Sequence, residues 1–268
     1  MNQLYRVIWV VCLLATAVLF SAPPRPAYAA TFVVTKTADT ADGTCDADCS
    51  LREAIIAANA AAGADVITVP AGTYTLSIAG TGENAGATGD LDITGNLTIN
   101  GAGASTTIIN ANSIDRVFHG VTTAGTTLIV AISDITIRGG NLPAGITNMG
   151  GGFASDSTTT GNTNLTLNNV QISNNTTGNN GGAVGFIKNA GAANHVLTIT
   201  NSTIANNLAL NGGGLVVMGA LSMSHLAPFP PTEPPRMAGV FTLQAIHQPS
   251  VWLTAQSVAT QPMAMVAV

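Results

Sequence analysis

Short segments in which apolar residues alternate with Thr, Asn and Ser fill much of the chain beyond residue 64. Residues 165–175 align with residues 197–207 at an offset of 32 positions, and both segments end in Asn-Asn. Because side chains alternate between the two faces of a strand, one side of each segment is apolar. We expect four of these side chains to point into a core: Leu165, Leu167, Val170 and Ile172.

The repeat extends beyond these two segments. In the same ungapped alignment, Gly-Gly-Ala-Val at 181–184 coincides with Gly-Gly-Leu-Val at 213–216, and weaker copies lie at 132–137, 150–153 and 91–99. A single coil cannot bury its apolar edge, whereas coils stacked about 4.8 Å apart form a continuous core. The repeat therefore predicts a solenoid of parallel strands. An antiparallel β-sandwich is the alternative; it explains the alternation but not the common register of Asn-Asn and Gly-Gly.

The recurring Asn and Gly residues predict how each coil turns. Stacked Asn amides can hydrogen-bond from coil to coil at a turn, and Gly permits the positive φ angles of a change in direction. We therefore expect an asparagine ladder built from Asn174, Asn175, Asn206 and Asn207.

A helix start precedes the repeats. Ser50-Leu51-Arg52-Glu53 forms a capping box, in which Ser50 and Glu53 each accept a hydrogen bond from the other's backbone N–H. This box predicts a helix from about Leu51 to about Ala60, with Leu51, Ala54, Ile55 and Ala58 on one face. Short strands are expected at 65–70 and 73–78.

Residues 49–54, Cys-Ser-Leu-Arg-Glu-Ala, carry a family resemblance. The stretch 31–76 resembles the opening module of secreted bacterial proteins named after this six-residue motif. The resemblance implies a right-handed parallel β-helix of the pectate-lyase type, with the helix after Ser50 covering the open end of the solenoid. The fold class expected is thus all-β, a right-handed parallel β-helix solenoid with a short N-terminal capping helix. The resemblance implies no particular chemistry.

A second resemblance concerns the repeats. The pairing of Ile-x-x-Asn, at 172–175 and 204–207, with Gly-Gly-Ala-Val at 181–184 is similar to the repeat of polymorphic outer-membrane proteins. In those repeats the first position is usually Phe, whereas here it is Ile. The difference leaves the solenoid prediction intact and weakens any transfer of adhesin function.

The N-terminus has the pattern of a secretion signal. An apolar run at 7–20 follows Arg6, and the small-x-small site Ala27-Tyr28-Ala29 lies downstream. We expect a signal peptide at 1–29 and a secreted or cell-surface protein without a transmembrane segment in the mature chain; an uncleaved membrane anchor is the alternative. Export would permit a disulfide between Cys45 and Cys49, although the nearby aspartates could instead hold a cation.

The C-terminal part departs from the repeat composition. Residues 220–268 contain no Asn or Asp, but seven Pro and four Met. In a shifted reading frame, two further copies of the Asn- and Gly-containing repeat are compatible with the genetic code. We hypothesise a frameshift near His225, with a genuine Pro-rich linker and anchor as the alternative. The expected parts are the signal peptide, a cap module at 30–64, parallel β-helix repeats at 65–225, and an irregular tail at 226–268.

Charge is scarce along the whole chain. Only 8% of residues are charged and the formal net charge is −5, with no basic cluster. These values argue against nucleic-acid binding, and no motif indicates a cofactor or a metal. We expect possible partners to be a glycan or a cell-surface protein.

Few residues suggest chemistry. Asp90 and Asp92 share a strand face, with Asp115 and His119 close in sequence, and Arg116 and Arg138 are the only candidate lyase bases. Isolated charges on strands are usually solvated, so we expect no carboxylate cluster beside either arginine. The remaining candidates are expected to lack partners: Asp134, Asp156, His119 and His195. The sequence assigns no catalytic residue.

These observations favour an exported β-helix for adhesion, display, or glycan or protein binding, without catalysis. The alternative is a polysaccharide-degrading lyase or glycoside hydrolase on the same fold. Three or more carboxylates converging on one face would favour the enzyme, whereas a face of Thr, Asn and Ser would favour binding.

Overall fold

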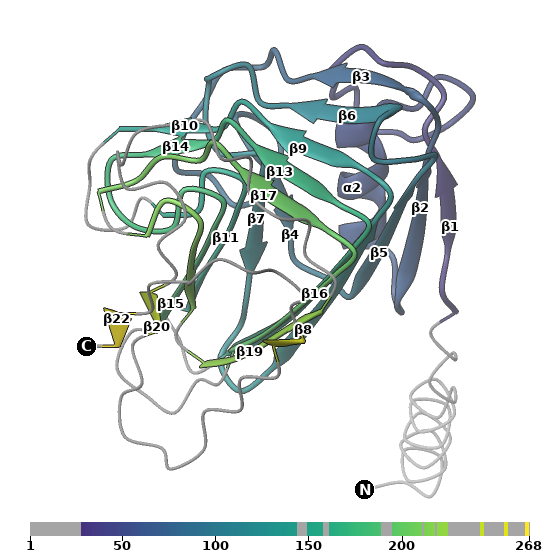
Figure 1. Ribbon diagram of the computed structural model, residues 1–268. Helices are drawn as coiled ribbons and strands as arrows, with labels where there is room; N and C mark the ends of the chain where they lie inside the picture. The colour runs from purple at the N-terminus through teal and green to yellow at the C-terminus, as the bar shows by residue number, and fades with distance from the viewer. Residues whose placement is uncertain are drawn as a thin grey trace, which may run out of the picture.

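The parallel repeats wind into a solenoid of three sheets around one core (Figure 1). This computed structural model describes residues 28–143, 149–157, 161–188, 195–210, 212–217, 219–224, 242–243, 255–256 and 266–267. Every strand pair in these ranges is parallel. The prediction of an all-β parallel β-helix is therefore confirmed, and an antiparallel sandwich is excluded.

Each coil from β2 to β18 contributes one strand to each of the three sheets. Sheet A contains, in spatial order, β1 (Thr31–Val33), β2 (Asp65–Val69), β5 (Leu97–Gly101), β8 (Thr127–Ser133), β12 (Asn162–Asn168), β16 (His195–Thr200), β19 (Gly219–Ser224) and β21 (Ala255–Gln256). Sheet B contains β3 (Gly72–Thr75), β6 (Thr107–Asn110), β9 (Thr136–Arg138), β13 (Gln171–Ser173) and β17 (Thr203–Ala205).

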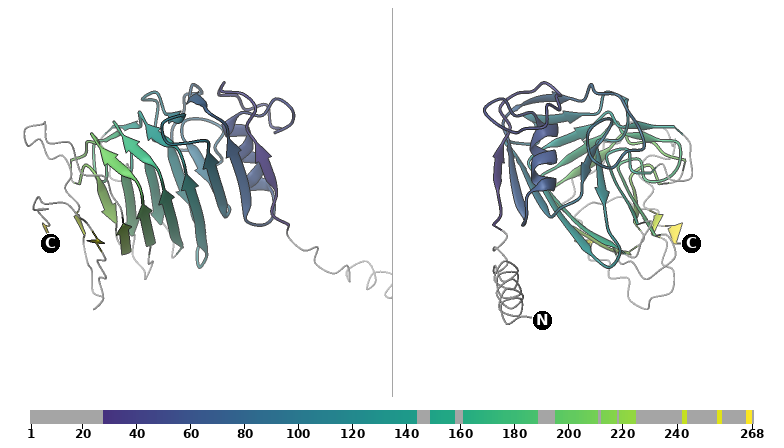
Figure 2. Two further views of the ribbon diagram at one scale, coloured as in Figure 1. Left: turned by 45° about the vertical axis from the view of Figure 1, so that its right-hand side comes forward. Right: turned by 180° about the vertical axis from the view of Figure 1, so that it is seen from behind.

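Sheet C closes the coil. It contains β4 (Leu91–Ile93), β7 (Phe118–Val121), β11 (Phe153–Ser157), β15 (Val184–Lys188), β18 (Leu215–Val217), β20 (Thr242–Leu243) and β22 (Val266–Ala267). A small pair, β10 (Asn141–Leu142) and β14 (Thr176–Thr177), lies between sheets B and C along the chain. The coils stack in sequence order away from the N-terminal end (Figure 2).

Sheets A and B have the register that the sequence alignment predicts. Leu165 lies opposite Leu197, and Ile172 lies opposite Ile204. The four residues expected in the core, Leu165, Leu167, Val170 and Ile172, are each at most 1% exposed. Alternation along each strand thus separates an apolar interior from a polar exterior.

The ungapped alignment is wrong by one residue in sheet C. Val184 lies opposite Leu215 rather than Val216, so the repeat here is one position shorter than in sheet A. The reason is the backbone turn before each strand, because Gly181 and Gly212 both have φ near +60°. Glycine adopts this angle without a Cβ clash, so the turn fixes which glycines correspond.

The two residues of each Asn-Asn pair have different roles, the first through its backbone conformation and the second through its side chain. Asn174 and Asn206 are exposed and have φ of 56° and 55°, so they turn the chain after the sheet B strand. Asn175 and Asn207 are buried, and Asn175 donates to the Asn207 Oδ1 from both its backbone N–H and its side-chain amide at 3.0 Å. The ladder within the described coils therefore uses only the second asparagine of each pair.

The N-terminal end of the solenoid is covered by helix α2 (Leu51–Ala60), which we call the lid. Its capping box is complete, because Ser50 accepts from the Glu53 N–H and Glu53 accepts from the Ser50 N–H. The predicted apolar face, Leu51, Ala54, Ile55 and Ala58, is buried against the first coil.

Cys45 and Cys49 form a disulfide in the loop before the lid. The proposed signal peptide lies outside the described residues apart from its last two positions, and most of the tail lies outside them too. The tail strands that the structure describes, β20, β21 and β22, pair in parallel with sheets A and C. Among the described residues, no helix has the length and apolar character needed to cross a membrane.

Candidate functional site

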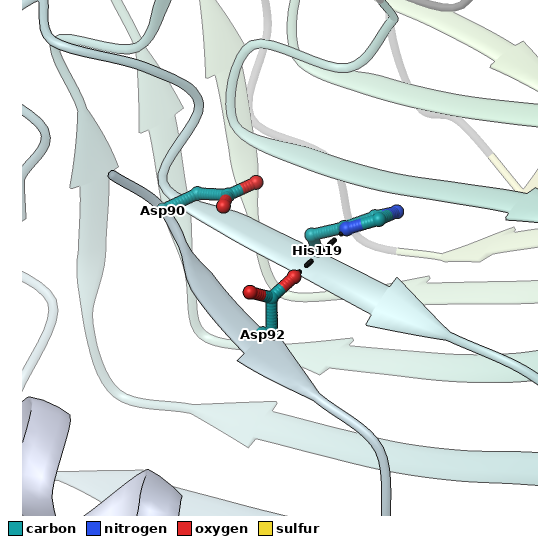
Figure 3. A group of neighbouring side chains, drawn as sticks. All are labelled: Asp90, Asp92 and His119. Carbon is teal, nitrogen blue, oxygen red and sulfur yellow. Dashed lines mark hydrogen bonds and ion pairs between the residues drawn. The ribbon is translucent and has the colours of Figure 1, made fainter. Parts of the chain in front are cut away.

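Two neighbouring strands of sheet C bring acidic and imidazole side chains together near the lid. Leu91 and Ile93 of β4 and Phe118 of β7 are fully buried in the core. Asp92 and His119 occupy the alternate positions and lie opposite one another in the sheet. Strand alternation and parallel register therefore place the carboxylate and the imidazole side by side (Figure 3).

The Asp92 carboxylate is fully engaged. Its Oδ1 lies 2.9 Å from the Nδ1 of His119, and its Oδ2 accepts a hydrogen bond from the backbone N–H of Gly86 at 2.8 Å. Asp92 is 0% exposed and His119 only 5%. These contacts fix both side chains, which lie beneath the loop that precedes β4.

A second group of charges adjoins this pair. Arg116 Nε lies 2.9 Å from Asp90 Oδ2 and 3.7 Å from Asp115 Oδ1. Burial raises the pKa of Asp90 to about 7, because the opposing effect of Arg116 is offset by the negative charges of Asp92 and Asp115. Burial also raises the pKa of Asp115. Both carboxyl groups therefore hold a proton more readily than an exposed aspartate does.

The lid holds the strand that carries these aspartates. Arg52 is 1% exposed and donates to the backbone carbonyls of Gly86, Gly89 and Asp90 at 2.8–3.1 Å. Seven positions later, Asn59 donates to the Asp92 carbonyl at 2.7 Å and accepts from the Thr94 N–H. Residues seven apart lie on the same helix face, so one face of α2 fixes residues 86–94 at both ends.

Asp90, Asp92 and His119 each offer a metal-ligand atom, and these atoms all lie within 4.8 Å of one another. Carboxylate pairs that hydrolyse glycosides stand about 5–10 Å apart with the sugar between them. The three ligand atoms are closer than that, and all three residues are buried. The arrangement suits a small cation better than a sugar ring.

Several sequence predictions about these residues are wrong. Asp90, Asp92 and Asp115 are buried rather than solvated, and they do form a carboxylate cluster beside Arg116. His119 and His195 are buried and have partners: Asp92 for the first, and the Thr163 N–H, which donates to the His195 Nδ1, for the second. The rule that charged strand residues face solvent fails at Asp92 because the loop before β4, which the lid holds in place, lies over its carboxylate.

The remaining candidates lie elsewhere. Arg138 forms no ion pair within the described part of the chain, and Asp134 accepts a hydrogen bond from the Asn169 side chain at a corner between sheets A and B. Asp156 lies on β11, opposite Val121 of β7. Neither Arg138 nor Asp134 belongs to the group of ligand atoms around Asp92.

Sequence reasoning missed Arg52, Asn59 and Asp39 as positioning residues. Asp39 receives two hydrogen bonds from the Arg52 guanidinium, at 2.7 and 3.2 Å, inside the cap module. The signal was available in the sequence, because Arg52 and Asn59 are polar residues seven apart on a helix composed mostly of Ala, Leu and Ile.

The outer side of sheet A offers a different kind of surface. One row across its strands consists of Thr68, Asn100, Ser133, Asn168 and Thr200, and the adjacent row includes Thr98, Thr166 and Thr198. Side chains within the first row hydrogen-bond across coils, as in Ser133 to Asn100 at 3.0 Å and Thr200 to Asn168 at 2.8 Å. No charged residue faces outward in β2, β5, β8, β12 or β16.

Comparison with known proteins adds no relative. A scan against protein-family models, a search of curated proteins and a search of solved structures each found no match to this chain.

Proposed function

We propose that this protein is an exported, cell-surface or secreted β-helix that binds a glycan or a surface protein along the outer side of sheet A. The observation that carries the proposal is the uncharged row of Thr, Asn and Ser side chains that crosses β2, β5, β8, β12 and β16. The N-terminal secretion pattern and the resemblance of residues 49–54 to the opening module of secreted bacterial proteins support export.

The chemistry of this surface suits sugars. Hydroxyl and amide groups both donate and accept hydrogen bonds, as the hydroxyls of a glycan do. The parallel register repeats similar groups at the coil spacing, about 4.8 Å, so that successive units of an extended ligand meet equivalent partners. The absence of charged side chains on the outward side of these strands favours a neutral ligand over an acidic one.

The Asp90, Asp92 and Asp115 cluster is the observation that favours the enzyme alternative, since three carboxylates do converge. They are buried and already engaged with Arg116, His119 and the Gly86 N–H, and they do not line the outer side of sheet A. A polysaccharide lyase or hydrolase needs its acid and base at the substrate. The cluster therefore supports catalysis less strongly than the sheet A rows support binding.

Binding can be tested by placing a charge in the centre of the surface. Thr166 is exposed in the middle of sheet A, so Thr166→Arg should leave the fold intact while obstructing a ligand. We expect binding to immobilised neutral polysaccharides or to host-cell surfaces to fall by about tenfold or more, because a steric and charge mismatch at the centre of an interface weakens binding strongly. Affinity would be measured by surface plasmon resonance or cell binding.

The matched control is Gln171→Arg, which adds the same side chain to an exposed position of sheet B. Equal loss of binding in both variants would contradict the assignment to sheet A. Release of shortened or unsaturated sugars from the same polysaccharides would instead support the enzyme alternative.

A further inference from the structure

The cluster beside the lid contains three buried carboxyl groups and one paired guanidinium. Asp90, Asp92 and Asp115 are each at most 5% exposed, and Arg116 is the one guanidinium paired with them in the described residues. Buried charges are normally paired or bound to a metal, because an isolated ion in the interior costs several kcal/mol. A divalent cation at this position would, together with Arg116, balance the three carboxylates.

Asp90 is ion-paired with Arg116 but differs from Asp92 and Asp115, which each accept a backbone N–H. Its side chain is 6% exposed, yet its carboxylate accepts no hydrogen bond from any residue that the structure describes. Arg116 Nε lies 2.9 Å from Oδ2 but not in hydrogen-bonding geometry, since this buried nitrogen has no hydrogen-bond acceptor. The carboxylate is directed toward the same space as Asp92 and His119 (Figure 3).

We propose that Asp90, Asp92 and the Nδ1 of His119 bind a divalent transition-metal cation, with Zn²⁺ as the best fit. The cation would take the place of the hydrogen between His119 Nδ1 and Asp92 Oδ1. An imidazole nitrogen with two carboxylate oxygens matches the ligand preference of Zn²⁺, whereas Ca²⁺ and Mg²⁺ prefer oxygen alone. Three protein ligands leave one position of a tetrahedral site for water. This site is independent of the sheet A surface.

The surroundings already provide the support that metal ligands need. The Gly86 N–H holds Asp92 Oδ2, Arg116 stands beside Asp90 Oδ2, and Arg52 and Asn59 fix the strand that carries both aspartates. Such outer contacts orient ligands and tune affinity. Ligand atoms on one Zn²⁺ are about 3.4 Å apart. The three ligand atoms lie within 4.8 Å of one another, so no separation must contract by more than about 1.4 Å, which carboxylate rotation can supply.

The test is zinc binding to the full chain after stripping with a chelator. Equilibrium dialysis should give about one Zn²⁺ per chain, and excess Ca²⁺ should not displace it. Co²⁺ in place of Zn²⁺ should give a visible absorption band characteristic of nitrogen and oxygen ligation. No Zn²⁺ bound, or displacement by Ca²⁺ at equal concentration, would overturn the proposal without the use of any variant.

Substitutions of the proposed ligands test whether these residues form the zinc site. Asp90→Asn and His119→Gln preserve size, and each should weaken Zn²⁺ affinity by about tenfold or more and remove the Co²⁺ band. Asp48→Asn is the matched control, since it removes the same charge from a side chain that is 73% exposed in the cap loop, and it should bind as the wild type does. Circular dichroism without metal identifies any variant that fails to fold. Wild-type affinity in both folded site variants would overturn the proposal.

Discussion

At the scale of single residues, the second asparagine of each Asn-Asn pair is a structural element of the solenoid. The Asn175 side chain donates to the Ile137 carbonyl at 3.1 Å and accepts from the Gly140 N–H at 2.9 Å, while also meeting Asn207. One buried amide thus satisfies backbone groups of the preceding coil and joins the following one. Buried polar groups left without such partners cost about 1–3 kcal/mol each.

Asn175→Ala should therefore lower the free energy of unfolding by about 2–4 kcal/mol, because the Gly140 N–H and the Ile137 carbonyl lose the side-chain amide that bonds to both. Chemical denaturation would measure the change. Asn174→Gly is the control: Asn174 serves through its positive φ, which glycine also adopts, so its substitution should change stability by less than about 1 kcal/mol. Equal losses in the two variants would show that the ladder has no special role.

At the scale of the element, the lid depends on one buried carboxylate. Glu53 is 1% exposed and accepts from the Ser50 and Asp42 N–H groups and the Thr40 hydroxyl. Burial alone would raise its pKa, but these hydrogen bonds outweigh burial and lower the pKa of Glu53 to about 2. The Glu53 carboxylate therefore joins the lid to the loop that precedes it.

The lowered pKa of Glu53 sets the sign of an acid dependence. Because the folded pKa of about 2 lies below the ordinary value of 4.5, Glu53 stabilises the fold above about pH 4.5, and this contribution is lost as the pH falls toward 2. Glu53→Gln should lower the free energy of unfolding at pH 7 by about 1–3 kcal/mol. The difference in free energy of unfolding between this variant and the wild type should shrink as the pH falls from about 4.5 toward 2. Urea midpoints at several pH values would measure this.

Glu83→Gln provides the comparison, since the Glu83 carboxylate accepts hydrogen bonds within a loop outside the lid. This variant should keep the acid dependence that Glu53 produces. If Glu53→Gln retained the full acid dependence of the wild type, the lid carboxylate would not be its source.

At the scale of the whole molecule, the interior consists of apolar residues that repeat from coil to coil, and ion pairs contribute little to it. The chain has 8 Lys+Arg and 13 Asp+Glu among 268 residues. The ion pair between Arg52 and Asp39 is buried, with side chains 0% and 2% exposed, and salt screens such pairs little. Apolar residues stacked from coil to coil supply most of the stability.

Thermal stability should therefore respond weakly to ionic strength. Between about 0.02 and 0.5 M NaCl, the melting temperature should change by less than about 3 °C, because exposed ion pairs contribute about 0–1 kcal/mol each and few are present. Differential scanning calorimetry would measure it. A much larger fall would mean that surface charges carry stability that the described contacts do not reveal.

The sequence predicts periodic features well and non-periodic ones poorly. The alternation of Leu165, Leu167, Val170 and Ile172 defines strands and core because burial repeats with strand period. The cluster of Asp90, Asp92 and His119 was not predictable as a buried site from that period. It depends on the loop before β4, which lies over Asp92. Arg52 and Asn59 of the lid hold this loop and strand through hydrogen bonds to residues 33–38 positions away.

The lid also bears on how such a chain can change during evolution. A central coil, such as the one from β12 to β15, pairs on both sides with strands in equivalent register, so its duplication or loss would rejoin compatible edges. The first coil has no such freedom, because α2 recognises residues 86–94 individually through Arg52 and Asn59. Length variation by gene duplication is therefore confined to coils beyond the first, and the capped end is inherited as a unit.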